Sequence, residues 1–167
     1  DRESVERVRQ MLQQLLAERF KLRVHEETRP MPIYALVLAK SGGALGPELR
    51  RSTRDCLEEW KAQGMPDARN VACGSMPSTR AGAVTGQAVE MRPLVRSLWD
   101  WTGRPVVDRT GLTGRFDFTL RWAPDGSTDT DAPSTFTALQ EQLGLKLEPG
   151  TGPIDVLVVD AAERPPP

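Results

Sequence analysis

The chain has 167 residues, of which 38% are hydrophobic and 27% are charged, and its formal net charge is −1. This length suits a domain with its own core, and no apolar run approaches the ~18 residues that a membrane-spanning helix needs. A nearly neutral chain creates no general field for nucleic acid or anionic lipid, so we expect neither as a partner.

The first 39 residues predict a helix followed by two strands. Residues 4–18 place apolar side chains at helical spacing on one stripe, formed by Val5, Val8, Leu12, Leu15 and Leu16. Residues 20–25 then alternate apolar and polar side chains, which is typical of a half-buried strand. The two prolines in 26–32 predict a turn, and the apolar run 33–39 predicts a central strand.

Residues 41–83 interrupt this pattern with glycines, prolines and polar residues, and we interpret them as a loop-rich insertion with a candidate short helix at 55–63. The chain's two cysteines, Cys56 and Cys73, lie in it. A disulfide between them would close a loop of 16 intervening residues, worth ~3 kcal/mol in the chain-entropy model. Two unpaired thiols in a reducing cell are the alternative. We favour the disulfide, which in turn favours an exported protein.

A second unit occupies the middle of the chain. Residues 83–89 suggest a leading strand, and 91–103 predict a helix that ends at a glycine. Residues 104–108 form a short predicted strand, and 108–114 contain two glycines that predict a turn. The next eight residues, 115–122, alternate apolar and polar side chains without a break, as a strand with one buried face does.

The C-terminal unit resembles the first. Residues 134–143 predict a helix with Phe136, Leu139 and Leu143 on one face. Residues 144–148 predict a strand, 150–153 a turn and 154–159 a second strand.

The two terminal units match at a nearly constant offset. Leu22 and Leu145 are 123 positions apart, and Ile33 and Ile154 are 121 apart. We therefore predict an α+β fold of repeated helix–strand–strand units. It comprises a β-α-β-β-α-β core over 84–160 and an N-terminal α-β-β unit, with the helices packed on an antiparallel or mixed sheet.

This pattern predicts a single domain over residues 1–167. Its internal pseudo-repeats are expected at 4–39, 84–122 and 133–160. A polar, acidic loop at 123–133 and a disordered, proline-rich tail at 161–167 complete the organisation.

Three phrases carry a family resemblance: LLAERFKLRVHEETRPMPIYALVLAK, RPVVDRTGLTGRFDFTLRWAPD and LQEQLGLKLEPGTGPIDVLVVD, in this order. Together they resemble the Solibacter-type soil-associated protein family, a bacterial domain of unknown function that is abundant in acidobacteria. The resemblance covers most of the chain except 44–82. It implies an exported protein, similar in part to extracytoplasmic portions of membrane sensor-transducer metallopeptidases, and it implies no catalytic residues. At the level of fold, the core is also similar to the short N-terminal domain of secretins and TonB-dependent receptors.

Few residues suggest catalysis. His25 is the only histidine, and its strand phase places it on a polar face, which favours a solvated or hydrogen-bonded side chain over a catalytic one. Asp108 and Asp117 flank the two-glycine turn and could form a catalytic carboxylate pair. We favour structural roles: an Asx turn for Asp108, and cross-strand ion pairs for Asp117, which faces outward between Arg115 and Arg121.

Other signals for chemistry are lacking. The sequence contains no P-loop, dinucleotide-binding glycine motif, H-E-x-x-H motif or EF-hand loop. With one histidine and two well-separated cysteines, a Cys/His zinc site would lack ligands. We therefore expect neither a metal nor a cofactor.

Binding residues can be suggested from side-chain chemistry. Trp99 and Trp101 cannot both point inward from one helix, because two positions are about 200° apart, so one of them is exposed or lies beneath the insertion. An exposed tryptophan suggests a contact site, and the strip Lys21, Arg23 and Arg29 is a candidate for an anionic partner. The candidate binding residues are Trp99, Trp101, Lys21, Arg23 and His25.

The sequence thus predicts a non-catalytic binding, sensing or protein-interaction module of the cell envelope, periplasmic or extracellular, with a protein or small-molecule partner. We expect no transmembrane segment in this chain and a signal peptide that has already been removed. One alternative is a hydrolase-type enzyme with its site between residues 41–83 and the sheet. A purely structural domain of a larger envelope assembly is the other.

Overall fold

The structure is a computed structural model, which describes residues 2–63, 73–76, 78–80, 82–124 and 132–164. The chain divides into two compact units. The first unit joins residues 1–31 to 152–167, and the second unit consists of residues 32–151.

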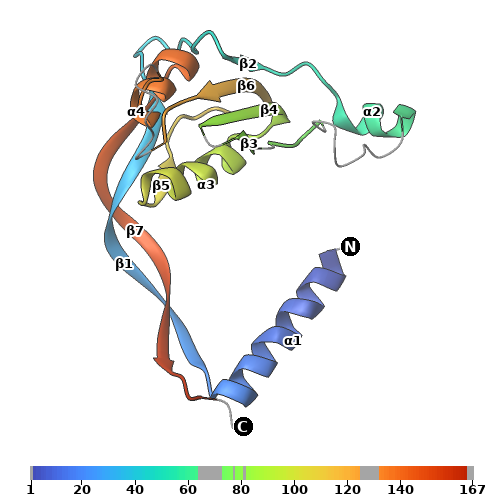
Figure 1. Ribbon diagram of the computed structural model, residues 1–167, viewed down its shortest axis with the longest axis vertical. Coiled ribbons are helices and arrows are strands. Elements are labelled where there is room, and N and C mark those ends of the chain that lie inside the picture. The colour runs from blue at the N-terminus through green and yellow to red at the C-terminus, as the bar shows by residue number, and fades with distance from the viewer. Residues whose placement is uncertain (1, 64–72, 77, 81, 125–131, 165–167) are drawn as a thin grey trace. The chain divides into compact units, whose positions relative to one another are not determined.

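Two sheets organise the strands (Figure 1). A four-stranded antiparallel sheet has the order β2-β6-β4-β3, formed by Leu49–Arg51, Phe116–Arg121, Ala83–Val89 and Ser78–Arg80. A three-stranded sheet has the order β5-β1-β7, formed by Val106–Asp108, Arg23–Leu38 and Leu145–Ala161. Strand β5 pairs with β1 in parallel, so this sheet is mixed. Helices combined with these two sheets confirm the predicted α+β class.

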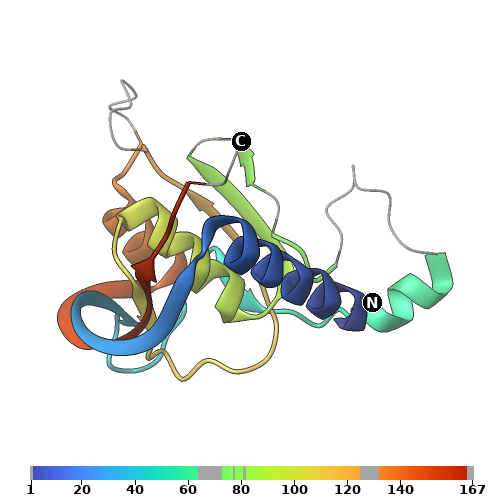
Figure 2. The same cartoon turned by 90° about the horizontal axis from the view of Figure 1, so that it is seen from below.

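The core of the second unit lies between the four-stranded sheet and helix α3 (Met91–Thr102), which runs along one face of that sheet (Figure 1 and Figure 2). The predicted alternation of β6 turns every second side chain to the helix. The predicted apolar stripe of α3 meets them, and Gly103 ends the helix in the left-handed conformation. The buried cluster includes Phe116, Phe118, Leu120, Leu94 and Leu98.

The helix predicted at 134–143 forms with a change of pitch. Residues Thr135–Ala138 (α4) are α-helical, and Leu139–Leu143 (η1) form a π-helical turn. The hydroxyl oxygen of Ser134 accepts a hydrogen bond from a backbone N–H three residues later, at 3.2 Å, and so caps the helix as predicted. Gly144 ends the helix in the left-handed conformation.

The predicted element order β-α-β-β-α-β is confirmed: β4, α3, β5, β6, α4 with η1, and β7 follow one another. The two predicted terminal hairpins are wrong. Residues 23–38 form the single strand β1, and residues 145–161 form the single strand β7. Each terminal unit is therefore a helix followed by one long strand, and the N-terminal α-β-β unit does not form from residues 4–39.

The prolines of β1 explain this error. A proline fixes φ near −65°, which extended backbone accepts, and its only loss is an N–H donor. The N–H of Tyr34 points away from β7, because it donates to the carbonyl of Pro105 beside β5 at 2.9 Å. Pro32 and Pro30 lie two and four residues earlier and face the same way. No described strand pairs with β1 on that side there, so neither proline breaks a ladder.

The first unit consists of helix α1 (Arg2–Phe20) with the outer parts of β1 and β7. The predicted helix 4–18 is confirmed. Lys21, with φ of 49°, takes the left-handed conformation after the helix. The N–H of Glu163 donates to the carbonyl of Phe20 at 2.6 Å, which ties the end of β7 to the end of the helix.

The insertion at 41–83 is more ordered than a loop. It supplies β2 and β3, the two outer strands of the four-stranded sheet, and the predicted short helix forms as α2 (Cys56–Gln63). The predicted disulfide is present, with the sulfurs of Cys56 and Cys73 bonded to each other. Of the predicted acidic loop, residues 125–131 lie outside the described residues, as do residues 165–167 of the predicted tail.

None of the helices that the structure describes is both long and apolar enough to cross a membrane.

Candidate functional site

A polar cleft of about 370 Å³ lies on the face of the four-stranded sheet that is opposite the core. Side chains alternate along a strand, so the neighbours of buried Gly86 and Phe118 point to this outer face. The segment 47–54, which includes β2, forms one rim. The polar lining is Glu48, Arg50, Arg54, Thr85, Gln87, Asp117 and Thr119.

A β-bulge positions Asp117 at the floor of the cleft. The register between β4 and β6 shifts between Gly86 and Val89, and Ala88 within the bulge has a φ of 51°, which an L-residue rarely adopts. The backbone N–H of Ala88 donates to Oδ1 of Asp117 at 2.8 Å. Asp117 therefore replaces the ladder partner that the bulge removes. Such bulges occur often beside functional sites.

Asp117 is held as a carboxylate. Burial of its side chain raises the pKa, but this effect is outweighed by hydrogen bonds from Ala88 and Ser52 and by the guanidinium of Arg50, so the net pKa is lowered. Arg50 lies directly opposite Asp117 in the strand register, and its Nε is 3.5 Å from Oδ2. The predicted cross-strand ion pair of Asp117 is thus present, and its partner is Arg50 on β2.

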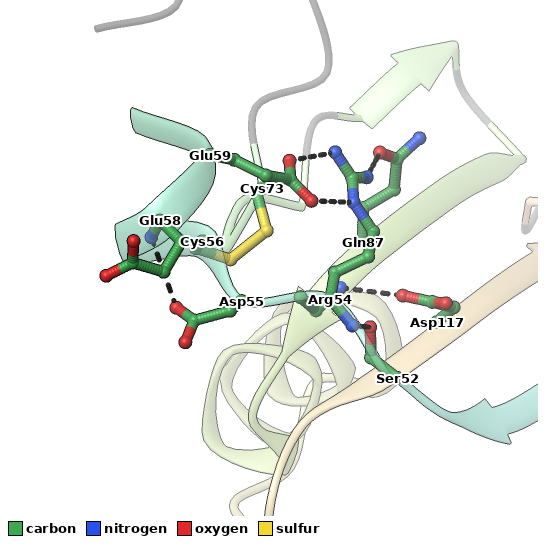
Figure 3. Close-up of polar contacts among 10 residues, drawn as sticks. Ser52, Arg54, Asp55, Cys56, Glu58, Glu59, Cys73, Gln87 and Asp117 are labelled. Carbon is green, nitrogen blue, oxygen red and sulfur yellow. Dashed lines mark hydrogen bonds and ion pairs between the residues drawn. A yellow bond between two sulfur atoms is a disulfide. The ribbon is translucent and has the colours of Figure 1, made fainter. Parts of the chain in front are cut away.

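Arg54 forms the second polar centre of the cleft (Figure 3). Its Nε and Nη2 donate to the two carboxylate oxygens of Glu59 at 2.8 and 2.5 Å, and its Nη1 donates to the side chain of Gln87. The hydrogen bond from Arg54 lowers the pKa of Glu59. Because its guanidinium is hydrogen-bonded to both Glu59 and Gln87, the side chain of Arg54 is held in one position at the edge of the cleft.

The disulfide stabilises the segment that carries Arg54. Cys56 begins α2, Cys73 precedes Gly74, and both cysteines are buried against Ala88. The N–H of Gly74 donates to the carbonyl of Gln87 at 2.7 Å. The disulfide therefore fixes the start of α2 beside the bulge of β4 (Figure 3).

The cleft suits recognition better than proton chemistry. Its described lining contains no histidine, and both cysteines are in the disulfide rather than free as nucleophiles. Asp117 is ionised and already paired, which makes it a poor general acid. The side chain of Arg50 is 81% exposed and can turn toward a ligand. A polar group that replaces or extends these hydrogen bonds is what such an arrangement can bind.

Among the described residues, no three histidine, cysteine, aspartate or glutamate side chains lie close enough together to hold a metal ion.

The two tryptophans of α3 separate as the helical angle requires. Trp99 is 47% exposed. Trp101 is half-buried, and its ring lies 4.2 Å from that of Trp122, centroid to centroid. Only Trp99 is therefore available as a surface contact, and a binding role for either residue stays a prediction.

His25 belongs to the first unit and is hydrogen-bonded. Its Nδ1 lies 2.9 and 3.0 Å from the two carboxylate oxygens of Asp160, and its Nε2 lies 4.0 Å from Glu27. Arg29 donates to Glu27 at 2.7 Å, and this hydrogen bond lowers the pKa of Glu27. The structure supports the interpretation of His25 as a solvated, hydrogen-bonded side chain.

Lys21 and Arg23 are both exposed, at the junction of α1 and β1. They line a shallow hollow of about 490 Å³ together with Ala17, Leu22, Ala161 and Glu163. One acid and two bases therefore meet around an apolar floor. The predicted use of Lys21 and Arg23 for an anionic partner stays a prediction.

Asp108 has the structural role that was predicted. Its Oδ1 accepts hydrogen bonds from the backbone N–H and the hydroxyl of Thr110, at 2.9 and 2.8 Å, as in an Asx turn. It does not line the cleft that contains Asp117. The structure thus does not assemble Asp108 and Asp117 into one pocket.

The sequence alone did not single out Arg50, Arg54, Glu59 and Gln87 as site residues. Arg54 lies in the insertion, and its partner Gln87 is 33 positions away in β4, so no local spacing connects them. The register of β2 against β6 was equally hidden, because β2 has only three residues. The glycine in 83–89 was the one available signal, since an isolated glycine in a strand often marks a bulge or close packing.

Asp117→Ala is expected to destabilise the chain by about 2 kcal/mol, because it leaves the N–H of Ala88 without its acceptor. The folded pKa of Asp117 lies below its ordinary value of 3.8. Its contribution to stability is therefore complete above that value and is lost as the pH falls through the folded pKa. Urea unfolding between pH 2 and pH 7 should show a steeper acid loss for the wild type than for Asp117→Ala. Parallel curves would contradict this role.

Comparisons with known proteins give one match. A family model matches residues 1–162 and so includes nearly the whole chain. No curated protein and no solved structure matches it.

Proposed function

The chain belongs to the family described as "Protein of unknown function (DUF3738)", and we propose that it is a non-catalytic interaction module of the cell envelope. This membership agrees with the sequence resemblance in its coarser part, a domain of unknown function. Its soil-bacterial, acidobacterial character and its likeness to secretin and TonB-receptor domains remain part of the proposal.

The single observation that carries the proposal is the apolar surface of the first unit. All the buried apolar side chains of the described residues lie in the second unit, between Ile33 and Leu147. The first unit instead exposes apolar side chains on α1, each by more than half: Val5, Val8, Met11, Leu12 and Leu15. A surface of this kind marks a contact site on a protein.

Covering the apolar side chains of α1 would contribute a large free energy. Covering one large apolar side chain contributes roughly 1.5–3 kcal/mol, and five on α1 alone are more than half exposed. Four of them, at steps of 3, 4 and 3 residues, form the single stripe Val5, Val8, Leu12 and Leu15. An amphipathic helix that offers such a stripe fits an apolar groove or another helix.

Placement in the envelope rests on the disulfide. Structural disulfides persist in oxidising compartments and are rare in the cytosol. The sulfurs of Cys56 and Cys73 are bonded and buried beside Ala88. This supports export to the periplasm or beyond.

A hydrolase is the second candidate, and the position of the cleft is the one observation in its favour. The cleft lies between the segment 47–54 of the insertion and the sheet, where an enzyme site was considered, and it contains Asp117. Against it stand the absence of histidine and free thiol among the described lining residues and the ionised state of Asp117. Hydrolysis of model esters or peptides that Asp117→Asn abolishes would establish the enzyme.

The interaction role can be tested by charging the stripe of α1. Leu12→Glu/Leu15→Glu should abolish the crosslinked products that the tagged wild type forms in cells that naturally express the protein. Gln10→Glu/Gln13→Glu adds the same charge on another face of the helix and should leave these products unchanged. Absence of any crosslinked product with the wild type, or equal products from all three proteins, would refute the proposal.

A further inference from the structure

We propose that residues 154–161 of β7 pair with the same residues of a second copy of this chain, so that two first units share one four-stranded sheet. This deepens the proposed interaction role and rests on it, because it names the partner of the same unit. The observations behind it are the free edge of β7, the protected edge of β1 and the distribution of apolar and acidic side chains along β7.

The outer edge of β7 is free. In the sheet order β5-β1-β7, β7 is the last strand, so among the described residues only β1 pairs with it. A strand edge of this length carries a row of N–H and C=O groups that can pair with another chain. Residues 154–161 contain no proline and no lysine, the residues that usually block such pairing.

The outer edge of β1 is blocked by contrast. Pro30 and Pro32 both lack an N–H on the side away from β7, and Arg23 and Arg29 add charge along the same stretch. The two edges of this two-stranded ribbon thus differ: β1 is protected, and β7 is open. New strands are expected to add to β7 only.

Cross-strand contacts define the two faces of the ribbon. His25 bonds to Asp160 and Thr28 bonds to Asp155, so the strands run in opposite directions and these pairs mark opposite faces. The face with Thr28 and Asp155 also carries Val24, Leu157 and Val159. These three side chains are 41%, 64% and 58% exposed. One face of the ribbon therefore carries three exposed apolar side chains beside Glu26, Thr28 and Asp155.

A second copy fits this edge without charge repulsion, because the acids of the two copies do not meet each other. In an antiparallel two-fold pairing centred on Leu157, Asp155 lies opposite Val159 of the second copy. Asp160 lies opposite Ile154 of the second copy. No like charges meet directly across the strands, and the residues opposite each other share a face, as register requires.

The surface available matches what a stable dimer needs. A two-stranded ribbon is marginal in water, whereas four strands with an apolar face can be stable. The edge alone is too small. Five side chains of α1 that are more than half exposed and the ribbon's Val24, Leu157 and Val159 make eight. Edge pairing alone leaves the faces of the ribbon open. The dimer reaches the roughly 800 Å² per partner of a standard interface when α1 of each copy also packs on the shared apolar side chains, at roughly 100 Å² for each side chain.

Light scattering on the full chain tests the proposal first. The wild type should have a mass of twice 18.5 kDa at micromolar to millimolar concentrations. Leu157→Lys places two like charges at the axis and should weaken the dimer by roughly a hundredfold. The matched control Phe136→Lys charges an exposed apolar side chain of the second unit and should stay dimeric. A wild type that is monomeric throughout this range would overturn the proposal.

A symmetric crosslink tests the register. Leu157→Cys should form a disulfide between two copies on mild oxidation, because residues opposite each other at the axis approach closely. Glu26→Cys lies on the same face but on β1, one strand away from the axis, and should not crosslink to itself. A dimer in which Leu157→Cys stays reduced, or one that survives Leu157→Lys, would also overturn the proposal.

The two proposals fail in different ways. A monomeric wild type whose crosslinked products are lost in Leu12→Glu/Leu15→Glu overturns the dimer and leaves the interaction role standing, with a foreign chain as partner. Crosslinked products that persist in Leu12→Glu/Leu15→Glu refute the role of the α1 stripe, whatever the mass of the wild type.

Discussion

Gly144→Ala is expected to destabilise the folded chain by about 3–5 kcal/mol, since left-handed strain and overpacking each cost roughly 1–3 kcal/mol. Gly144 has a φ of 69°, and a Cβ there would lie 2.5 Å from the backbone nitrogen of Gly46. Backbone at this point cannot move away freely. The carbonyl of Gly144 accepts from the N–H of Ala39 at 2.8 Å, and the N–H of Gly46 donates to the carbonyl of Leu143 at 2.9 Å.

Gly46→Ala should be nearly as harmful, because its Cβ would lie 2.3 Å from the carbonyl oxygen of Gln142. Two other glycines separate the causes. Gly103 has a φ of 65° but open space around it, so Gly103→Ala tests strain alone and should cost about 1 kcal/mol. Gly42 has neither constraint, so Gly42→Ala should change stability by less than about 0.5 kcal/mol.

Urea unfolding of these four variants, with an unchanged slope against denaturant, measures the differences. Equal stabilities of Gly144→Ala and Gly103→Ala would show that the contact with Gly46 is unimportant. In that case the close approach of Gly46 to the end of η1 would not explain the requirement for glycine at position 144.

Removal of the disulfide is expected to cost about 3 kcal/mol, because the bridge spans 17 positions and limits the unfolded chain. The variant Cys56→Ala/Cys73→Ala should unfold at lower urea concentration than the oxidised wild type. Reduced wild type should behave similarly. Both effects follow from the same lost constraint, so they should not add.

Reductant supplies the control for this experiment. It should lower the urea midpoint of the wild type and leave Cys56→Ala/Cys73→Ala unchanged. A midpoint of the wild type that does not respond to complete reduction would contradict a stabilising role for the bridge. The argument for an exported protein would then lose its main support.

Most of the second unit could be predicted because local patterns there match the final packing. The alternation of residues 115–122 allows one buried face, and all four of its apolar side chains are buried: Phe116, Phe118, Leu120 and Trp122. The stripe of α3 is equally regular. The disulfide could be predicted because a chain with two cysteines offers one pairing.

The terminal hairpins could not be predicted correctly from composition. Pro30 and Pro32 by themselves suggest a turn. They fit within a strand because, among the described residues, β1 has no neighbouring strand on the side where their N–H groups are missing. That could not be known from the sequence, since it depends on where the distant β5 begins to pair with β1. Gly150 and Gly152 at the corresponding place in β7 similarly suggested a turn, yet neither has a positive φ. Sheet order, which is a long-range property, decided both cases.

The candidate site was hidden for a related reason. Arg50 meets Asp117 only because β2 adds to β6 in one register, and the two residues are 67 positions apart in the sequence. The bulge at Ala88 depends on a second long-range pairing, that of β4 with β6. Site residues that come together through a short edge strand leave no periodic signal.

The antiparallel contact of β1 and β7 has a mechanical consequence. The N–H of Glu163 meets the carbonyl of Phe20 at one end of this strand pair, followed inward by His25 with Asp160 and Thr28 with Asp155. A pull that draws residues 20 and 163 apart loads these contacts one after another instead of all at once. The ribbon should therefore peel open under low force, starting where α1 joins it.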